Sequence, residues 1–173
     1  TLEYTMWFTQ FLPGLVKLRA PVPLGGTSNH FRREALFAVG GWDPYNVTED
    51  ADLGMRLARF GYRTTVIASS TYEEAPARLR PWLRQRTRWF KGWMQVWLVH
   101  MRSPRKLIRE LGPRGFVVFQ LLAGGSVLAA LVHPLFLIEL LWEIASAGQS
   151  GASATLATSA HAATLLTGYL VSG

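Results

Sequence analysis

Cysteine is absent from this sequence of 173 residues. A chain without cysteine has no disulfide framework, no thiolate metal site and no cysteine nucleophile. The absence fits a protein that faces the reducing cytosol. Any chemistry in this chain must therefore use other side chains.

Basic residues are absent from the last third of the chain. All 18 Lys and Arg lie between Lys17 and Arg114, and nine of the 11 acidic residues precede Phe116, so residues 1–115 carry a formal charge of +9. The remaining residues contain two acids and carry −2. A region this basic can serve nucleic acid, an anionic membrane surface or phosphorylated substrates.

Charge of either sign is missing from the 23 residues between Phe116 and Ile138. As a helix that rises about 1.5 Å per residue, this segment would span roughly 30–35 Å, the thickness of a bilayer core. Pro134 would kink this helix or end it before a second segment. A second uncharged run, 152–171, is rich in Ala and Thr. We therefore expect a transmembrane region at 116–173, with spans at about 116–138 and 152–171. A buried core helix is the alternative for the first span.

A cluster of basic residues directly precedes the first expected span: Arg102, Arg105, Lys106, Arg109 and Arg114. By the positive-inside rule, this cluster places the basic region in the cytoplasm. A nucleic-acid-binding domain has no need of such a tail. We therefore expect an integral protein of a bacterial-type inner or plasma membrane, with a lipid bilayer and no nucleic acid among its partners.

The two ends of the chain suggest a piece of a longer protein. It begins at Thr1 without an initiator Met or a signal-peptide pattern, and it ends at Gly173 within a hydrophobic run. Near the first end, apolar and aromatic residues recur at spacings of three and four: Tyr4, Trp7, Phe8, Phe11 and Leu15. The spacing predicts an amphipathic helix over 1–18, limited by Pro13-Gly14. This helix either packs on its own domain or lies in a membrane interface, where Trp and Phe are favoured.

Three segments in the middle of the chain have recognisable local signals. Thr48 can cap a helix from Glu49 to Phe60 through its hydroxyl. Residues 62–68 are rich in β-branched side chains and predict a strand. Pro81 suits the first turn of a long helix that reaches about Met101. Ser103-Pro104 is expected to end this helix, and Gly112-Pro113 to break the chain again.

The Thr48-Glu49-Asp50 triplet opens the first of these helices. Acids are common in the first turn of a helix, and most such triplets only cap it. The functional interpretation makes Asp50 a general base, which must come within hydrogen-bond reach of the proton that it takes. Glu49 and Asp50 are adjacent, so they point in different directions and cannot both serve one substrate atom.

The long helix after Pro81 presents a second candidate set. Gln85, Arg88 and Trp89 stand at i, i+3 and i+4, so they share one face. A planar guanidinium beside an indole suits a ligand with phosphate oxygens and a sugar face. Trp93 and Trp97 are expected in a buried aromatic stripe. The other basic residues of this helix are expected to contact solvent or lipid headgroups: Arg84, Arg86 and Lys91.

A loop of glycine and small polar residues precedes the Thr48 triplet by about 20 residues: Gly25-Gly26-Thr27-Ser28-Asn29. Glycine lets the backbone approach a ligand, while hydroxyl and amide side chains supply hydrogen bonds. Alone, such a motif is more often a turn. Its position makes Gly26, Thr27, Ser28 and Asn29 candidates for substrate binding.

Together these motifs resemble the C-terminal half of the processive family 2 glycosyltransferases, the cellulose-synthase-like membrane enzymes. The resemblance runs from Thr1 to about His133. It rests on the 25–29 loop, on Gly40-Gly41-Trp42-Asp43, on Thr48-Glu49-Asp50 and on Gln85-Arg86-Thr87-Arg88-Trp89, in that order.

The resemblance implies a fold and a reaction. The family has an α/β, Rossmann-like GT-A catalytic domain on the cytosolic face and transfers sugars from nucleotide-diphosphate sugars, with inversion and a divalent metal. Residues 1–18 would be an interface helix. Residues 19–115 would be the C-terminal, mostly helical part of the GT-A domain, with the acceptor-site helix at 81–101. Residues 116–173 would be transmembrane.

The resemblance also implies roles for the candidate residues. Asp50, in the catalytic triplet with Thr48 and Glu49, would deprotonate the acceptor hydroxyl. Trp89 would stack on the acceptor end of a polysaccharide or glycolipid. Gln85 and Arg88 would lie near the donor diphosphate, and the loop that contains Gly26, Thr27, Ser28 and Asn29 would line the acceptor site.

Three departures from the family pattern qualify these roles. No Asp-x-Asp motif precedes residue 48, so we expect the ligands of Mg²⁺ or Mn²⁺ mostly outside this chain and assign no metal ligand within it. Gly26-Thr27-Ser28 stands where cellulose synthases usually have Cys-Gly-Ser, which argues against cellulose as the product. A gating-loop motif of the Phe-x-Val-Thr-x-Lys type is missing. We expect the chain alone to be inactive.

Two alternatives to an enzyme remain. One is a truncated, non-catalytic membrane scaffold that keeps the acceptor half. The other is a module that binds anionic lipids through its basic helices. If only net charge matters, as in lipid binding, replacing Asp50 by Asn should be silent, whereas it should abolish turnover by an enzyme.

Overall fold

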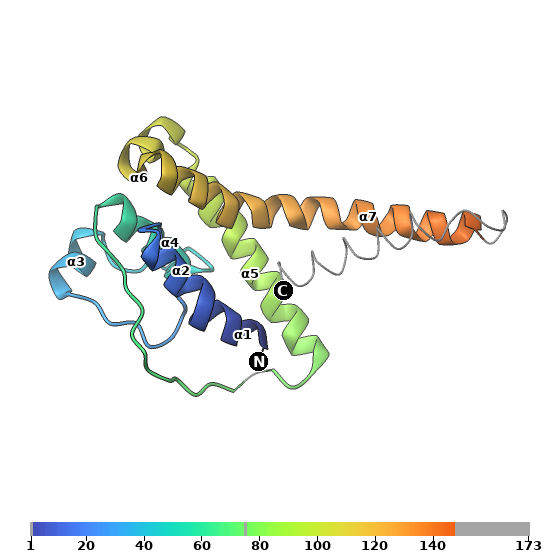
Figure 1. Cartoon of the computed structure of the whole chain (residues 1–173), viewed down its shortest axis with the longest axis horizontal. Helices are drawn as coiled ribbons and strands as arrows, with labels where there is room; N and C mark the ends of the chain where they lie inside the picture. Colours follow the sequence, from blue (N-terminus) through green and yellow to red (C-terminus); the bar gives the residue numbers. More distant parts are fainter. Residues whose placement is uncertain (1, 75, 148–173) are drawn as a thin grey trace. The chain divides into compact units, whose positions relative to one another are not determined.

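The computed structural model describes residues 2–74 and 76–147, which are helices joined by irregular segments (Figure 1). The chain divides into two compact units, Thr1–Gly124 and Gly125–Gly173. The candidate site residues all belong to the first unit, whose helices are built around three small cores.

The N-terminal segment is helical from Leu2 to Lys17 in three parts, α1 (Leu2–Met6), the π-helical η1 (Trp7–Phe11) and α2 (Leu12–Lys17). The expectation that Pro13-Gly14 would limit the helix was wrong. Pro13 lies in the first turn of α2, directly after the π-helical η1, and the backbone stays helical through it. Leu12 and Leu15 pack on Val22 in one core. The side chains of Phe8 and Phe11 are exposed, and their place in a membrane interface stays a prediction.

Two shorter helices follow, α3 (Arg33–Ala38) and α4 (Glu49–Arg59). The helix predicted over Glu49–Phe60 is confirmed to within one residue. The inner face of α4 is apolar, and Leu53 and Leu57 pack on Val39 in a second core. A Cβ at Gly54 would lie 2.4 Å from the Val22 carbonyl oxygen, so only glycine lets the chain at Val22 pass this close to α4.

The strand predicted over 62–68 is absent. The described residues contain no strand at all, so the β-branched run has no neighbour with which to form ladder hydrogen bonds. Its Val66 and Ile67 side chains are exposed. The part of the chain that the structure describes is therefore helical rather than α/β.

The main core lies among α4, the long helix α5 (Leu79–His100) and α6 (Pro104–Phe119). The predicted break at Ser103-Pro104 is confirmed, and Gly112, at φ 71°, interrupts α6 as the Gly112-Pro113 pair suggested. The π-helical η2 (Gln120–Gly124) follows. The fully buried residues of this core are Ala51, Met55, Val96, Leu107, Phe119 and Ala123. Trp93 and Trp97 pack against this core, as expected for a buried stripe.

The second unit begins with α7 (Gly125–Ala147), which continues through Pro134. One helical stretch of the described residues, Pro104–Trp142, is long and apolar enough to cross a membrane. Only 17% of the most apolar 18-residue segment of this stretch is buried. This result rests on length and composition, so a membrane-spanning role at 116–138 stays a prediction. The second expected span, 152–171, lies outside the described residues.

Leu107 and its neighbour Ile108 offer a matched test of the main core. The Leu107 side chain is fully buried, whereas that of Ile108 is 39% exposed. Leu107→Ala should lower the free energy of unfolding by about 2–5 kcal/mol, and Ile108→Ala by about 1 kcal/mol or less. Denaturant titration of the two variants measures both values. Equal losses would contradict this core assignment.

Candidate functional site

Asp50 lies in the first turn of α4 with its carboxylate half-buried. Its Oδ1 atom accepts a hydrogen bond of 2.7 Å from the Ala51 backbone N–H. Burial raises the pKa of Asp50 above its usual value, and the neighbouring Glu49 charge adds to that rise, although the Ala51 N–H and the Arg88 charge act against it. A carboxylate whose pKa is raised binds a proton more readily and is a better general base.

The glycine loop reaches this carboxylate. A Cβ built on Gly26 would lie 3.3 Å from Oδ2 of Asp50, which is tight for a side chain but open for glycine. Gly25 approaches the Phe8 ring of η1 in the same way, since its Cβ would lie 2.9 Å from that ring. The structure thus brings together Gly26 and Asp50, two candidates that are 24 positions apart in the sequence.

The polar side chains of the loop are bonded to the protein itself. The Thr27 hydroxyl donates to the Glu73 carboxylate, and the Ser28 and Thr71 hydroxyls lie 2.7 Å apart. The Asn29 amide donates to the Gly25 carbonyl. These bonds fix the loop to residues 71–73, a connection that sequence reasoning missed because it is made by exposed side chains 43–46 positions apart.

Thr48 is the N-cap residue of α4, and its side chain packs against α5. Its side chain makes no capping hydrogen bond, so the predicted hydroxyl cap is wrong. A Cβ at Gly92 would lie 2.2 Å from the Thr48 γ-methyl carbon, so the buried Thr48 side chain occupies the space that Gly92 leaves open. The third member of the triplet, Glu49, is exposed.

A second contact fixes the turn before α4 to α5. The Gln95 side chain donates to the Tyr45 carbonyl at 2.8 Å and accepts from the Val47 N–H at 3.3 Å. Gln95 and Gly92 stand three residues apart, so neighbouring positions of α5 hold both Val47 and Thr48. The Thr48-Glu49-Asp50 segment is therefore held against α5 by Gly92 and Gln95, which follow the Gln85–Trp89 motif on the same helix.

The α5 motif differs in one respect from expectation. Gln85 and Trp89 are half-buried and Arg88 is exposed. The guanidinium on the Trp89 ring belongs to Arg86, whose central carbon lies 4.9 Å from the Trp89 centroid and 5.3 Å from that of Trp82. Arg86 was expected to contact solvent or headgroups, and it is instead held by cation–π contacts.

Trp89 also has a partner from the N-terminal helix. The Tyr4 ring meets the Trp89 ring edge-on, with centroids 6.2 Å apart, and stacks parallel to the Phe8 ring at 6.1 Å. The indole thus belongs to an aromatic cluster shared by α1, η1 and α5.

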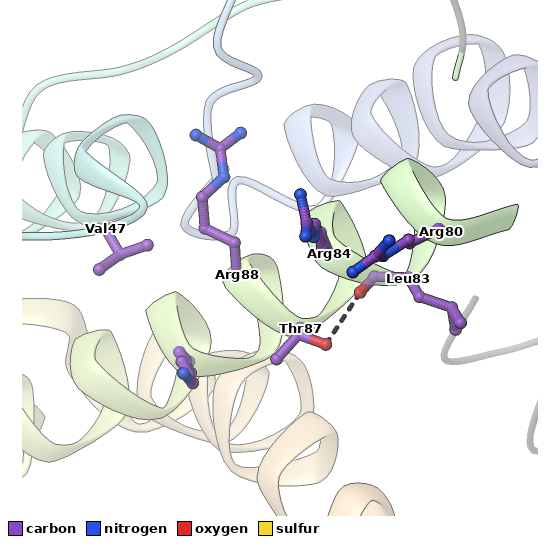
Figure 2. Close-up of a pocket in the computed structure, with 7 residues that line it drawn as sticks. Val47, Arg80, Leu83, Arg84, Thr87 and Arg88 are labelled. Carbon is purple, nitrogen blue, oxygen red and sulfur yellow. Dashed lines mark hydrogen bonds between the residues drawn. The ribbon is translucent and has the colours of Figure 1, made fainter. Parts of the chain in front are cut away.

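Basic side chains form a positive groove along α5 (Figure 2). Arg80, Arg84 and Arg88 follow one another at intervals of four residues and therefore share a side of the helix. The complete lining of the groove is Val47, Arg80, Leu83, Arg84, Thr87, Arg88 and Lys91. Four cations and no acid in this lining suit a ligand with several negative oxygens.

The described residues include no group of three or more His, Asp or Glu side chains that could hold a metal ion. Asp50 and Asp52 diverge, since Asp50 faces Gly26 and Asp52 is buried against His100. The described residues therefore do not fit a metal site.

Sequence reasoning missed the most buried charged residue of the site. The Asp52 side chain receives hydrogen bonds from the Arg56 Nε atom at 2.7 Å and the His100 Nε2 atom at 3.0 Å. Burial opposes the charge on Asp52, but His100 and Arg56 together outweigh it and lower the pKa of Asp52. The signal for this role was helical spacing, since Asp52 stands three residues before the buried Met55 and therefore shares its side of α4.

Comparison with known proteins identifies the family. Residues 1–171 match the model of the family described as "Glycosyl transferase family group 2". The chain therefore belongs to this family of glycosyltransferases. Family membership implies a GT-A fold, to which the described residues contribute helices.

Three curated relatives show how the match is distributed. A probable glycosyltransferase, YdaM, of Bacillus subtilis (strain 168) is 36% identical over 86 residues, which are 49% of this chain and 20% of that protein. The beta-monoglucosyldiacylglycerol synthase of Synechocystis is 33% identical over 81 residues, 46% of this chain and 17% of that protein. The UDP-forming cellulose synthase catalytic subunit of Komagataeibacter sucrofermentans is 35% identical over 75 residues, 43% of this chain and 10% of that protein.

The chain thus spans no more than about a fifth of the length of these relatives. No solved structure matches it. The comparisons identify the family and assign no role to single residues.

The contact between Thr48 and Gly92 predicts a stability difference between two glycines. Gly92→Ala would place a methyl group within 2.2 Å of the Thr48 side chain and should lower the free energy of unfolding by about 1–3 kcal/mol through overpacking. Gly14→Ala, at a helical glycine whose Cβ would meet nothing within 4 Å, should leave it unchanged or raise it. Thermal unfolding of both variants tests the contact, and an unchanged Gly92→Ala midpoint would refute it.

Proposed function

We propose that this chain is the acceptor-side, general-base part of a membrane-bound, inverting glycosyltransferase. The enzyme would move a sugar from a nucleotide-diphosphate sugar to a growing polysaccharide or glycolipid. The observation that carries the proposal is the half-buried Asp50 carboxylate, with its raised pKa, beside Gly26 and within the field of Arg88.

Asp50 would act on the acceptor. Its Oδ2 atom, which faces Gly26, would take the proton from an acceptor hydroxyl as that oxygen attacks the anomeric carbon of the donor sugar. The bond between the anomeric carbon and the diphosphate oxygen breaks, and the diphosphate leaves with the electron pair. Attack from the face opposite the leaving group inverts the anomeric carbon.

The α5 groove would hold the donor. The leaving diphosphate carries negative charge that Arg88 and its neighbours Arg84 and Lys91 can stabilise, because guanidinium groups bind phosphate oxygens in pairs. Gln85 would support this end of the site. Burial of the Asp50 carboxylate raises its pKa and so opposes the lowering effect of the Arg88 charge.

Trp89 would provide a stacking platform for the acceptor. An indole face suits the apolar face of a sugar ring. The contacts of Trp89 with Arg86 and Tyr4 support this role, because they fix the plane of the ring before a substrate arrives. Positioning of this kind lowers the cost of orienting the acceptor hydroxyl.

The names of the relatives support the classes of substrate. One relative is named as a synthase of a glucosyl lipid and another as a UDP-forming cellulose synthase subunit. Both a glycolipid and a polysaccharide acceptor therefore fit this family. The candidate span in Pro104–Trp142 supports an enzyme at a membrane, with its basic part in the cytoplasm.

Replacement of Asp50 tests the proposal in the intact protein. Asp50→Asn keeps the shape of the side chain and should lower kcat by about 10²–10⁴-fold, the usual contribution of a general base. Donor binding should be largely unchanged. The matched control is Glu34→Gln, which removes the same charge from an exposed position of α3 and should leave the rate unchanged. If Asp50→Asn transfers sugar at the normal rate, this result would contradict the proposal and favour the scaffold or the lipid-binding alternative.

The pH dependence of transfer gives an independent test. Asp50 accepts a proton only when it is ionised, so kcat/KM should rise with pH, with a midpoint above 3.8, the ordinary value for Asp, because burial raises the Asp50 pKa. The Glu49 charge contributes to that rise. Glu49→Gln should therefore move this limb of the pH profile to lower pH, and a move to higher pH would contradict the assignment.

A further inference from the structure

A polar network around one buried carboxylate links four helices of the first unit. Asp52 of α4 bonds His100 at the end of α5 through Oδ1 and Arg56 through Oδ2. Arg56 also donates from Nη1 to the Val39 carbonyl at 2.6 Å, at the end of α3. Arg59 continues the chain of contacts, since it donates to Glu110 of α6 at 2.6 Å.

The donors in this network determine the form of His100. The Arg59 Nη1 atom lies 2.8 Å from the His100 Nδ1 atom. A guanidinium can only donate hydrogen bonds, so Nδ1 must be the acceptor and carry no proton. The ring proton is then on Nε2, which donates it to Asp52 Oδ1 at 3.0 Å. His100 is therefore a neutral imidazole with both nitrogens satisfied.

The charges of the surrounding groups agree with this form. Two carboxylates, Asp52 and Glu110, face two guanidinium groups, Arg56 and Arg59. A neutral His100 leaves these four charges balanced, whereas an imidazolium would add a positive charge beside Arg59 in a position where only 2% of the residue is exposed. The remaining neighbours are the Phe119 ring, edge-on at 5.7 Å, and the exposed Lys106, 3.7 Å from Glu110.

His100 belongs to the face of α5 that holds the Asp50 segment. The three buried residues of α5 are Gly92, Val96 and His100, spaced four apart, so they form one stripe along the helix. At one end of the stripe, Gly92 receives the Thr48 side chain. At the other end, His100 bonds Asp52. Asp50 lies between these two fixed points, in the same first turn of α4.

We propose that His100 is a positioning residue for sugar transfer. As the neutral Nε2–H imidazole, it fixes the rotation of α4 through Asp52 and thereby keeps the Asp50 carboxylate against Gly26. It touches neither donor nor acceptor. The proposal rests on the role proposed for Asp50.

A pair of variants in the intact protein separates positioning from simple packing. His100→Gln keeps an N–H near the Nε2 position that can donate to Asp52, whereas His100→Leu fills the space and cannot donate. His100→Leu should lower kcat by on the order of 10²-fold, the loss expected from a displacement of about 1 Å at a reacting group. The KM for the donor should change little, and His100→Gln should restore most of kcat.

Nuclear magnetic resonance of the histidine ring nitrogens tests the tautomer without any assay of transfer. In protein with ¹⁵N-labelled histidine at neutral pH, the signal that disappears in His100→Gln should show a protonated Nε2 and an unprotonated Nδ1. An imidazolium, or a ring with its proton on Nδ1, would overturn the proposal.

The kinetic results also have contrary outcomes. A folded His100→Leu variant with normal kcat, or a loss confined to the donor KM, would overturn the positioning role. If His100→Leu does not fold, His100→Gln alone decides, and a large loss of kcat in a folded His100→Gln variant refutes the proposal. Failure of the proposed function is seen separately, as normal transfer by Asp50→Asn.

Discussion

A buried negative charge must be compensated, and the structure of the first unit depends on how Asp52 is compensated. The carboxylate has two oxygens. One accepts a hydrogen bond from His100 of α5, and the other accepts one from Arg56 of α4 itself. Arg56 and Arg59 then extend the network to the end of α3 and to Glu110 of α6. Removing Arg56 would leave this charge uncompensated in the interior, which is far more costly than losing an apolar contact. The helices are thus held in one arrangement by polar groups as well as by the core around Met55 and Phe119.

This arrangement explains how two distant motifs form one site. Thr48-Glu49-Asp50 and the arginine-rich face of α5 share no side-chain pair that the sequence could reveal. They are joined through Gly92, Gln95 and His100, which hold Thr48, Val47 and Asp52 in turn. The consequence for chemistry is electrostatic. A half-buried carboxylate and a groove of cations lie close enough for Arg88 to influence Asp50, yet burial still raises the pKa of that carboxylate.

The sequence predicted the local features better than the long-range ones. Helix periodicity, proline and glycine placed α4, α5 and the kink at Gly112 correctly, because these signals act within a few residues. The β-branched run at 62–68 was misread, since a strand needs a neighbour that the described residues do not provide. The capping hydrogen bond expected of the Thr48 side chain was wrong, because this side chain packs against Gly92 of α5. The exposure expected of Arg86 was also wrong, because its guanidinium lies on the Trp82 and Trp89 rings of the same helix. Charge alone could not reveal that Asp52 is buried while Glu49 is exposed.

The contact of Thr48 with Gly92 has a consequence for motion. Gly92 has no side chain, so the Thr48 side chain lies directly against the backbone of α5, and the hydrogen bonds of His100 and Gln95 fix the same pair of segments elsewhere. Movement of the segment that carries Asp50 relative to α5 would break these contacts. The glycine loop is held differently, because its ties to residues 71–73 are hydrogen bonds at the surface that water can replace. The site thus combines a segment of α4 that is packed on α5 with a loop that is tied to the rest of the chain by the Thr27 and Ser28 hydroxyl groups.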